Sequence, residues 1–200
     1  MLQQEVELYN KMLEVIKNTL TSLINAIDGI VLMSTNLEEV FKLMQIYYAI
    51  FDNKIPTSWQ EISYPCLKPL GSWVIHLVQR LDFIRKWINE GEPANYWIAG
   101  FFQTQSFFTG VLQNYARKHK TPIDTLSFNH KILSKDEIEK QNGVPPDIGC
   151  YIYGFYLDGC KWDHTNHVIC DMDPHVLKCE MPYVWFLPCI ETELAHQLEQ

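Results

Sequence analysis

The spacing of the larger side chains changes once along this sequence, near Pro122, and that change limits the folds open to it. Before Pro122, apolar residues recur every three or four positions, which is the period of one face of a helix. After it, Leu126, Phe128, His130 and Ile132 alternate with polar residues, as in a strand with one buried face. A helical part of about 120 residues followed by a β-rich part predicts an α+β fold.

Four helices are expected in the first part. An apolar stripe predicts a helix over about 5–27, with Gly29 as its stop. Residues 35–38 have the Thr-x-x-Glu form of a capping box and predict the next helix start. Two further stripes predict helices over about 73–89 and about 104–118.

The second part contains short strand candidates separated by turn residues. Asp158-Gly159 is a favoured hairpin turn pair. The polar stretch from Ser134 to Asp147 contains two adjacent prolines and predicts a surface loop. The strand candidates are about 126–132, 151–157, 167–170 and 181–187.

The net charge of −8 arises after residue 120, and it argues against nucleic acid as a partner. Residues 1–120 contain 11 acidic and 11 basic side chains, whereas residues 121–200 contain 13 acidic and 5 basic ones. An acidic surface repels phosphate groups. The one basic run, Arg117 to Lys120, is interpreted as a cationic helix C-terminus that complements the helix dipole.

Neither a membrane span nor a secretory leader is expected. The longest apolar runs are far below the about 18 residues that cross a bilayer, and no basic segment precedes an apolar one at the N-terminus. Six cysteines in 200 residues are too few for a disulfide scaffold, so reduced thiols are expected. These features favour a cytosolic compartment.

Several segments occur together in one order along the sequence: Ser63–Val74, Phe107–Lys118, Gly149–Gly154 and Trp162-Asp163. Over about residues 5–188 the protein resembles the C-terminal region of dynein heavy chains, and it is closer to the axonemal inner-arm type than to the cytoplasmic type. The resemblance therefore spans nearly the whole sequence.

The resemblance implies a helical layer followed by a small antiparallel β-barrel. That barrel is expected to be incomplete, because the family continues into further strands beyond the segment Pro182–Trp185, whereas Ile190–Gln200 looks like a short polar helix. By the same resemblance, residues 1–30 form a helix like the end of the last AAA+ module. Residues 31–120 form the helical part of the C-terminal domain, and residues 121–200 form its truncated β-rich part.

The resemblance also implies a non-catalytic role. The sequence has no Gly-x-x-x-x-Gly-Lys-Ser/Thr loop, so no cofactor is expected here, and ATP and Mg²⁺ would belong to other modules of a longer motor. The region would lie on the AAA+ ring of the same heavy chain and modulate ATP-driven, microtubule-based movement in cilia. It would contact no microtubule directly, and other dynein subunits only indirectly. The expected location is the cytoplasm, the cytoskeleton and the axoneme of the cilium.

Seven residues are the candidates for packing and docking in that role. Gln113, Asn114 and Arg117 lie on the flank of a predicted helix, where they form either a solvated surface or an interdomain hydrogen-bond cluster. Asp163 is a candidate partner for Arg117. The seven residues are Trp73, Gln113, Asn114, Tyr115, Arg117, Trp162 and Asp163.

The alternative hypothesis is a free-standing zinc-binding module, using Cys160, His164, His167 and Cys170 as tetrahedral ligands. Because no Cys-x-x-Cys pair is present, free thiols and surface histidines are the preferred interpretation. A cysteine hydrolase with Cys66 or Cys150 as nucleophile lacks any local signature. His76 is expected to be packed or hydrogen-bonded on its helix.

Overall fold

The computed structural model describes residues 1–45, 55–66, 68–141, 143–176, 179 and 181–191. By packing, the protein divides into two units, Met1–Lys86 (unit 1) and Trp87–Gln200 (unit 2), and each is described by itself. The resemblance placed domain boundaries near residues 30 and 120. These boundaries divide the parts of a longer motor, and they stay predictions.

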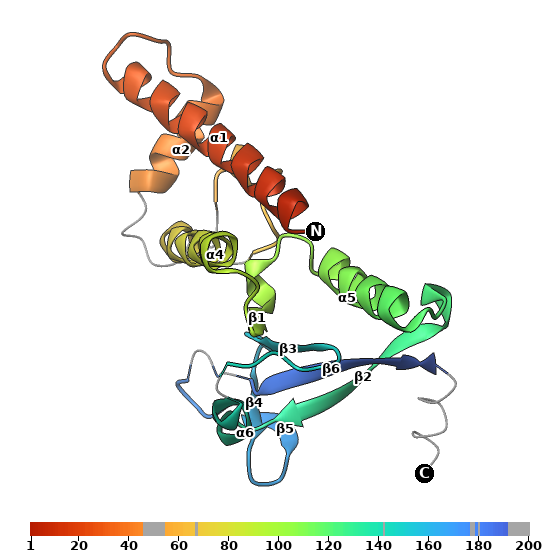
Figure 1. Cartoon of the computed structure of the whole chain (residues 1–200). Helices are drawn as coiled ribbons and strands as arrows, with labels where there is room; N and C mark the ends of the chain where they lie inside the picture. Colours follow the sequence, from red (N-terminus) through yellow and green to blue (C-terminus); the bar gives the residue numbers. More distant parts are fainter. Residues whose placement is uncertain (46–54, 67, 142, 177–178, 180, 192–200) are drawn as a thin grey trace. The chain divides into compact units, whose positions relative to one another are not determined.

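Unit 1 is helical (Figure 1). Helix α1 spans Leu2–Ile27, α2 spans Thr35–Gln45, α3 spans Thr57–Gln60 and α4 spans Leu70–Glu90, whose residues up to Lys86 belong to this unit. The helices predicted over 5–27 and 73–89 are therefore confirmed.

The cap of α2 differs from the prediction by one residue. The backbone N–H of Leu37 donates to Ser34 Oγ (3.3 Å), so Ser34 caps the helix and Thr35 is its first residue. Glu38 does not reach back to the helix start, because its carboxylate pairs with Lys42 (2.8 Å). The capping box predicted at 35–38 is wrong, although the predicted helix start is correct.

Unit 2 contains a four-stranded sheet of order β1-β3-β6-β2. Strand β1 pairs with β3 in parallel, and β6 pairs with both β3 and β2 in antiparallel register. A separate antiparallel pair is formed by β4 and β5. The strands are β1 Asn95–Trp97, β2 Leu126–Leu133, β3 Cys150–Tyr153, β4 Cys160–Asp163, β5 Val168–Asp171 and β6 Tyr183–Ile190.

These elements confirm the α+β class, with helices first and a small sheet region second. Among the described residues the sheet does not close into a barrel, as expected for an incomplete one. The turn predicted at Asp158-Gly159 is present, with Gly159 at φ 69°. It does not join a hairpin, because β3 ends at Tyr153 and pairs with β6.

Helix α5, Thr104–His119, packs on the sheet through aromatic side chains. The Phe108 ring lies 5.5 Å from Phe128 on β2 and 5.1 Å from Phe186 on β6, measured between ring centroids. Phe107, beside it, is fully buried. The predicted helix over 104–118 and its inward aromatic face are thus confirmed.

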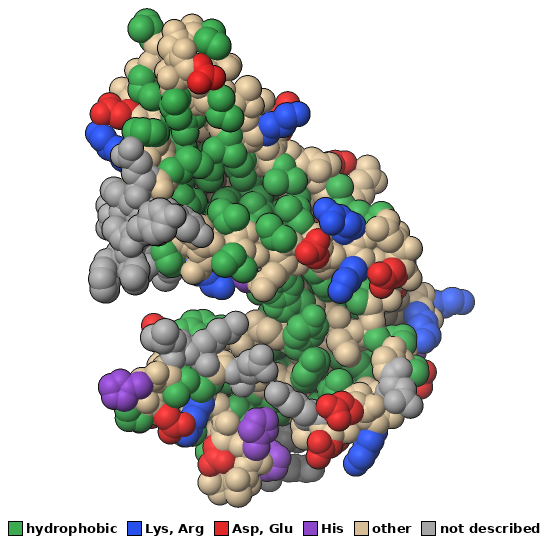
Figure 2. Space-filling view, turned by 90° about the vertical axis from the view of Figure 1, so that its left-hand side faces the viewer, with side chains coloured by type: hydrophobic (Ala, Val, Ile, Leu, Met, Phe, Trp, Pro, Cys, Tyr) green, Lys and Arg blue, Asp and Glu red, His purple; other side chains and the backbone are tan. Residues whose placement is uncertain are grey.

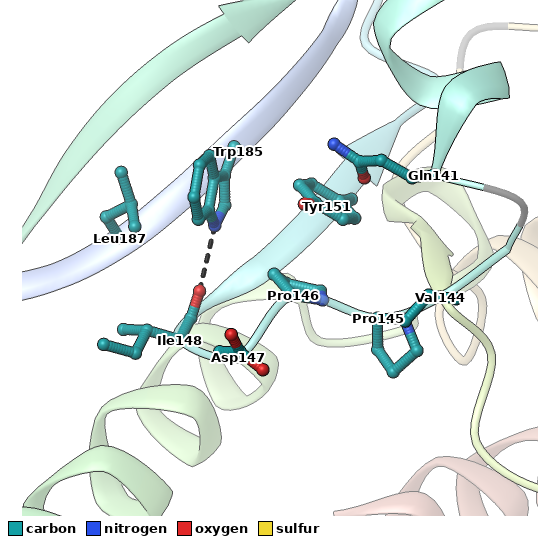
Figure 3. A pocket seen from close by; sticks show the side chains of 9 residues that line it. All are labelled: Gln141, Val144, Pro145, Pro146, Asp147, Ile148, Tyr151, Trp185 and Leu187. Carbon is teal, nitrogen blue, oxygen red and sulfur yellow. Dashed lines mark hydrogen bonds between the residues drawn. The ribbon is translucent and has the colours of Figure 1, made fainter.

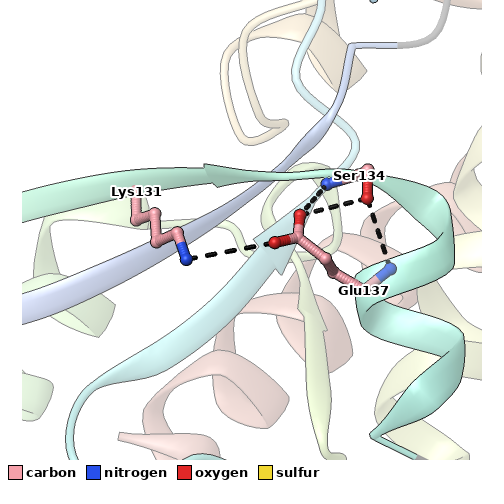
Figure 4. Close-up of polar contacts among 3 residues, drawn as sticks. All are labelled: Lys131, Ser134 and Glu137. Carbon is pink, nitrogen blue, oxygen red and sulfur yellow. Dashed lines mark hydrogen bonds and ion pairs between the residues drawn. The ribbon is translucent and has the colours of Figure 1, made fainter.

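The first half of the predicted loop at 134–147 is helical. Helix α6 spans Lys135–Lys140 and is opened by a complete capping box (Figure 4). Glu137 N donates to Ser134 Oγ (3.3 Å), and Ser134 N donates to Glu137 Oε2 (2.8 Å). Lys131 Nζ on β2 lies 3.9 Å from the same carboxylate, so the box also anchors α6 to the end of the strand.

Candidate functional site

Helix α4 presents apolar residues on two opposite faces. Its inner face buries Trp73, Leu77, Arg80 and Ile84. At 3.6 residues per turn, Val74, Ile75 and Val78 point to the opposite side, where Ile75 is 60% and Val78 is 51% exposed. We call these three residues the α4 outer face. Figure 2 shows that hydrophobic side chains also gather on the surface of the helical part of the protein. A helix that is apolar on both faces is typical of one covered on both sides.

The inner face of α4 is held by an aromatic stack. The Trp73 ring lies 5.9 Å from Trp59 and 6.0 Å from Tyr64, in stacked orientations. Trp73 is 1% exposed. Of the predicted docking residues, Trp73 therefore lies in the core of unit 1, where it fixes the orientation of α4.

A buried polar cluster joins α4 to α1. Arg80 Nη1 donates to Tyr9 Oη (3.4 Å) and Arg80 Nε donates to His76 Nδ1 (3.3 Å). The guanidinium carbon also lies 3.5 Å from the Tyr64 ring centroid, a cation–π contact. Burial raises the pKa of the Tyr9 hydroxyl, and the charge of Arg80 acts in the opposite direction. The buried carboxylate of Glu5 belongs to the same region.

The prediction that His76 is hydrogen-bonded is confirmed by this cluster. The cluster itself was not predicted from the sequence. One charged residue lies on the buried face of each of the two helices, Glu5 on α1 and Arg80 on α4. A charged residue of opposite sign on each apolar face was the signal from which such a pairing could have been predicted. Its structural result is a fixed α1–α4 pair that presents the α4 outer face in one orientation.

The predicted flank of α5 is exposed. Gln113, Asn114 and Arg117 all lie on the exposed side of the helix, and Tyr115 is half-buried and stacks on His119 (4.2 Å). Arg117 and His119 belong to the basic last turn, as predicted. The flank is therefore free to face solvent or another module, and the choice between these two interpretations stays a prediction.

Asp163 serves the turn between β4 and β5. Its carboxylate accepts hydrogen bonds from Thr165 N (2.8 Å), Asn166 N (3.3 Å) and Asn166 Nδ2 (2.7 Å). These hydrogen bonds, that from Thr165 first, lower the pKa of the Asp163 carboxyl. The carboxylate is therefore held by its own turn rather than by Arg117. Trp162, on β4, is half-buried and its ring lies 6.4 Å from His167.

The zinc hypothesis is wrong for the four residues proposed. In the β4–β5 register, Cys160 lies opposite Asp171 and Cys170 lies opposite Lys161. Side chains alternate between the two faces of a strand pair, so the two thiols point to opposite faces. Within the residues that the structure describes, no group of three or more His, Cys, Asp or Glu side chains could hold a metal ion.

Cys150, one of the two thiols considered as a nucleophile, is buried. All six cysteines are free. Burial raises the pKa of the Cys150 thiol to about 12, which disfavours the thiolate that a nucleophile needs.

Unit 2 also contains an open groove of about 510 Å³ (Figure 3). The rings of Tyr151 and Trp185 lie 5.6 Å apart along it, and Trp185 Nε1 donates to the backbone oxygen of Ile148 (2.9 Å). Asp147 is the sole ionisable carboxylate among its lining residues. The groove is mainly apolar and brings together no acid–base or nucleophile–base pair. Its lining residues are Gln141, Val144, Pro145, Pro146, Asp147, Ile148, Tyr151, Trp185 and Leu187.

Within the described ranges, no helix is both long enough and apolar enough to cross a membrane. The exposures of their side chains make the α4 outer face in unit 1 and the α5 flank in unit 2 the candidate surfaces. Neither surface assembles a catalytic constellation, and both are suited to contact with another protein surface.

Comparison with known proteins gives one consistent family. The family model for the C-terminal domain of dynein heavy chains matches residues 1–200. The protein is 44% identical over 198 residues to dynein axonemal heavy chain 1 of Mus musculus, a match that covers 98% of this sequence and 4% of that protein. It is 40% identical over 196 residues to dynein axonemal heavy chain 3 of Homo sapiens, covering 98% of this sequence and 4% of that protein.

A third relative, dynein axonemal heavy chain 12 of Rattus norvegicus, is 40% identical over 194 residues, covering 97% of this sequence and 6% of that protein. The sequence thus spans only a few per cent of the length of these relatives.

Proposed function

The protein belongs to the family of dynein heavy chains, as a C-terminal domain of the axonemal type, and from that premise we propose that it is a non-catalytic region that docks on the AAA+ ring of the same heavy chain. In this role it modulates ATP-driven, microtubule-based movement in the ciliary axoneme. Other modules bind ATP and Mg²⁺, and this region touches neither the microtubule nor nucleic acid. Other dynein subunits are affected indirectly, through the ring.

The α4 outer face is the observation that carries this proposal. Val74, Ile75 and Val78 are each between 42% and 60% exposed on a helix whose other face is fully packed. Burial of the exposed half of each of these residues contributes about 1 kcal/mol, so the three together supply about 3 kcal/mol of docking energy. Because the relatives are many times longer than this sequence, ample sequence exists in such a heavy chain to provide the covering surface.

Modulation of movement requires more than docking. A surface that binds two states of the ring equally well shifts nothing, whereas a surface that binds one state better shifts the population toward it. The α4 outer face and the α5 flank at Gln113, Asn114 and Arg117 belong to different units of the protein. Two separate contacts of this kind provide the differential binding when ring modules move during ATP turnover.

The test of docking is to mix the protein with a motor ring that lacks its own C-terminal region and to measure the complex by sedimentation. The wild-type protein is expected to bind in one-to-one stoichiometry. The double variant Ile75→Ser/Val78→Ser should bind at least about tenfold more weakly. It loses the burial of two apolar side chains, and each loss of about 1.4 kcal/mol in binding free energy weakens binding tenfold.

The matched control is Val176→Ser, which removes an exposed apolar side chain from unit 2 and should bind as wild type does. Circular dichroism establishes that each variant is folded. Failure of the wild-type protein to bind overturns docking, and equal binding by the double variant removes the α4 outer face from the interface.

A further inference from the structure

The connection between α1 and α2 has a hydrogen-bonded backbone. Gly29 adopts φ 75°, Gly29 N donates to Ala26 O (3.2 Å), and Ile30 N donates to Asn25 O (2.9 Å). This pair of bonds is a Schellman motif, the usual way to close a helix C-terminus. Val31 N adds a third bond to Asn25 O (3.3 Å), and the Ser34 cap fixes the other end. The segment is thus ordered from both sides.

The ordered segment presents apolar side chains outward. A Schellman motif is frequently accompanied by a hydrophobic contact between the residue after the glycine and the helix. Here that residue, Ile30, is 73% exposed, and Ile24, its expected contact, is 58% exposed. Leu32 is 92% exposed, more than any other large apolar side chain described. We call this surface the apolar knob. It comprises Ile24, Ile27, Ile30, Val31, Leu32 and Met33.

We infer that the apolar knob inserts into an apolar groove on a AAA+ ring module of the same heavy chain. The inference rests on the proposed function and adds a third contact to the α4 outer face and the α5 flank, made by a different part of unit 1 from the α4 outer face. A fixed backbone lowers the entropy lost on binding, so an ordered knob is suited to a specific apolar groove. Exposed apolar patches of this kind mark interaction sites.

The charge around the knob argues for a protein surface rather than a lipid surface. Between residues 24 and 34 the only charged side chain is Asp28. Binding to anionic lipid headgroups needs basic residues beside the apolar ones, and this segment has none. The relatives, in which this region is 4–6% of the whole length, provide the remaining sequence from which such a groove is built.

Met33 provides a probe that requires no mutation. It is 43% exposed, whereas Met12 on α1 is fully buried. Hydroxyl-radical oxidation followed by mass spectrometry is carried out on the protein alone and on its complex with a ring that lacks its own C-terminal region. In the complex, oxidation of Met33 should fall toward the rate at Met12. An unchanged rate at Met33 in a stoichiometric complex overturns the inference.

A variant tests the same contact by affinity. Ile30→Ser/Leu32→Ser should weaken binding to the ring at least about tenfold, because two mostly exposed side chains lose their apolar burial. The matched control is again Val176→Ser, with binding unchanged. Equal binding by the knob variant and the wild type overturns the inference while the proposed docking stands.

Three other outcomes also decide the matter. If the wild-type protein does not bind the ring at all, the proposed function fails and the inference falls with it. If the protein alone dimerises and the knob variant does not, a second copy occupies the knob. If the protein floats with phosphatidylserine vesicles and the knob variant does not, a lipid surface occupies it. Either of the last two results overturns the inference.

Discussion

Gly149 is the residue whose replacement tests the packing of unit 2 most sharply. It precedes β3 with φ +78°, and a Cβ placed on it would lie 1.9 Å from the backbone oxygen of Phe186 on β6. Gly159 has a similar φ of +69° and nothing within 4 Å of its Cβ position. The variants Gly149→Ala and Gly159→Ala therefore share the conformational cost and differ in the steric one.

The magnitudes follow from the geometry. Placing alanine in the left-handed region costs about 1–2 kcal/mol at either position. At Gly149 the β6 carbonyl must also move by more than 1 Å, because ordinary contacts lie at 3.4–4 Å. That movement strains the β3–β6 pairing at Cys150↔Phe186, and losing about two hydrogen bonds adds about 2 kcal/mol. We expect losses of about 3–4 kcal/mol for Gly149→Ala and about 1–2 kcal/mol for Gly159→Ala.

Urea unfolding of the 200-residue protein, followed by tryptophan fluorescence, measures both losses. The difference of about 2 kcal/mol should also lower the melting temperature of Gly149→Ala about 10 °C below that of Gly159→Ala, given the usual scaling for a unit of about 100 residues. Equal losses for the two variants would refute the close approach of Gly149 to β6.

Three further predictions concern single features of the fold. Arg80→Leu should lower the free energy of unfolding in urea by about 3 kcal/mol, because the hydrogen bonds and the cation–π contact of Arg80 are buried. Arg85→Leu, on the exposed side of the same helix, should lower it by less than about 0.5 kcal/mol. Similar losses for the two variants would contradict the buried cluster. The free energy of unfolding should fall as pH rises above 9, because the Cys150 thiol ionises near its ordinary pKa of 9.0 in the unfolded state and stays protonated up to about 12 in the folded state. Cys150→Ala should remove that contribution. If the free energy of unfolding of the variant has the same slope against pH as the wild type between pH 8 and 10, the prediction is contradicted. Treatment with EDTA should leave the circular dichroism melt unchanged, because the register separates Cys160 from Cys170, and a lower melting temperature would contradict that register.

The periodicity of the sequence was sufficient for the long elements. The stripes that predict α1, α4 and α5 extend over several turns, so each reports which face is buried without knowledge of the partner. The alternation from Leu126 to Ile132 likewise predicts β2. Strand β1 has only three residues, too few for any period to be detected, and it was missed.

Local signals failed where two neighbouring residues could serve equally well. Ser34 and Thr35 are both good N-caps, and the geometry of the preceding turn selects Ser34. The Ser134–Glu137 box was present in the sequence, but the adjacent prolines favoured a loop interpretation. At 34–38 the predicted helix start was correct and its cap was displaced by one residue. At 134–147 no cap was predicted, and the loop interpretation is wrong for residues 135–140.

Long-range contacts could not be read from spacing. The Arg80 cluster joins residues 71 positions apart, at Tyr9 and Arg80, and only the tertiary fold brings them within hydrogen-bond distance. The same limit applies to Asp163, whose pairing with Arg117 was suggested by charge alone and whose actual partners lie within its own turn. The glycines of the Gly149–Gly154 motif become intelligible in the structure, since a Cβ on Gly154 would lie 2.3 Å from Trp97 Cδ1.

The most direct test of the central claim is the ATPase rate of a motor ring that lacks its own C-terminal region, measured with and without saturating amounts of this protein. If the region biases the ring toward one of its states, the rate should change on addition of the wild-type protein and should return toward that of the ring alone with Ile75→Ser/Val78→Ser at the same concentration. A rate that stays constant while sedimentation shows the complex fully formed would contradict a modulating role and leave the region as a passive layer on the ring.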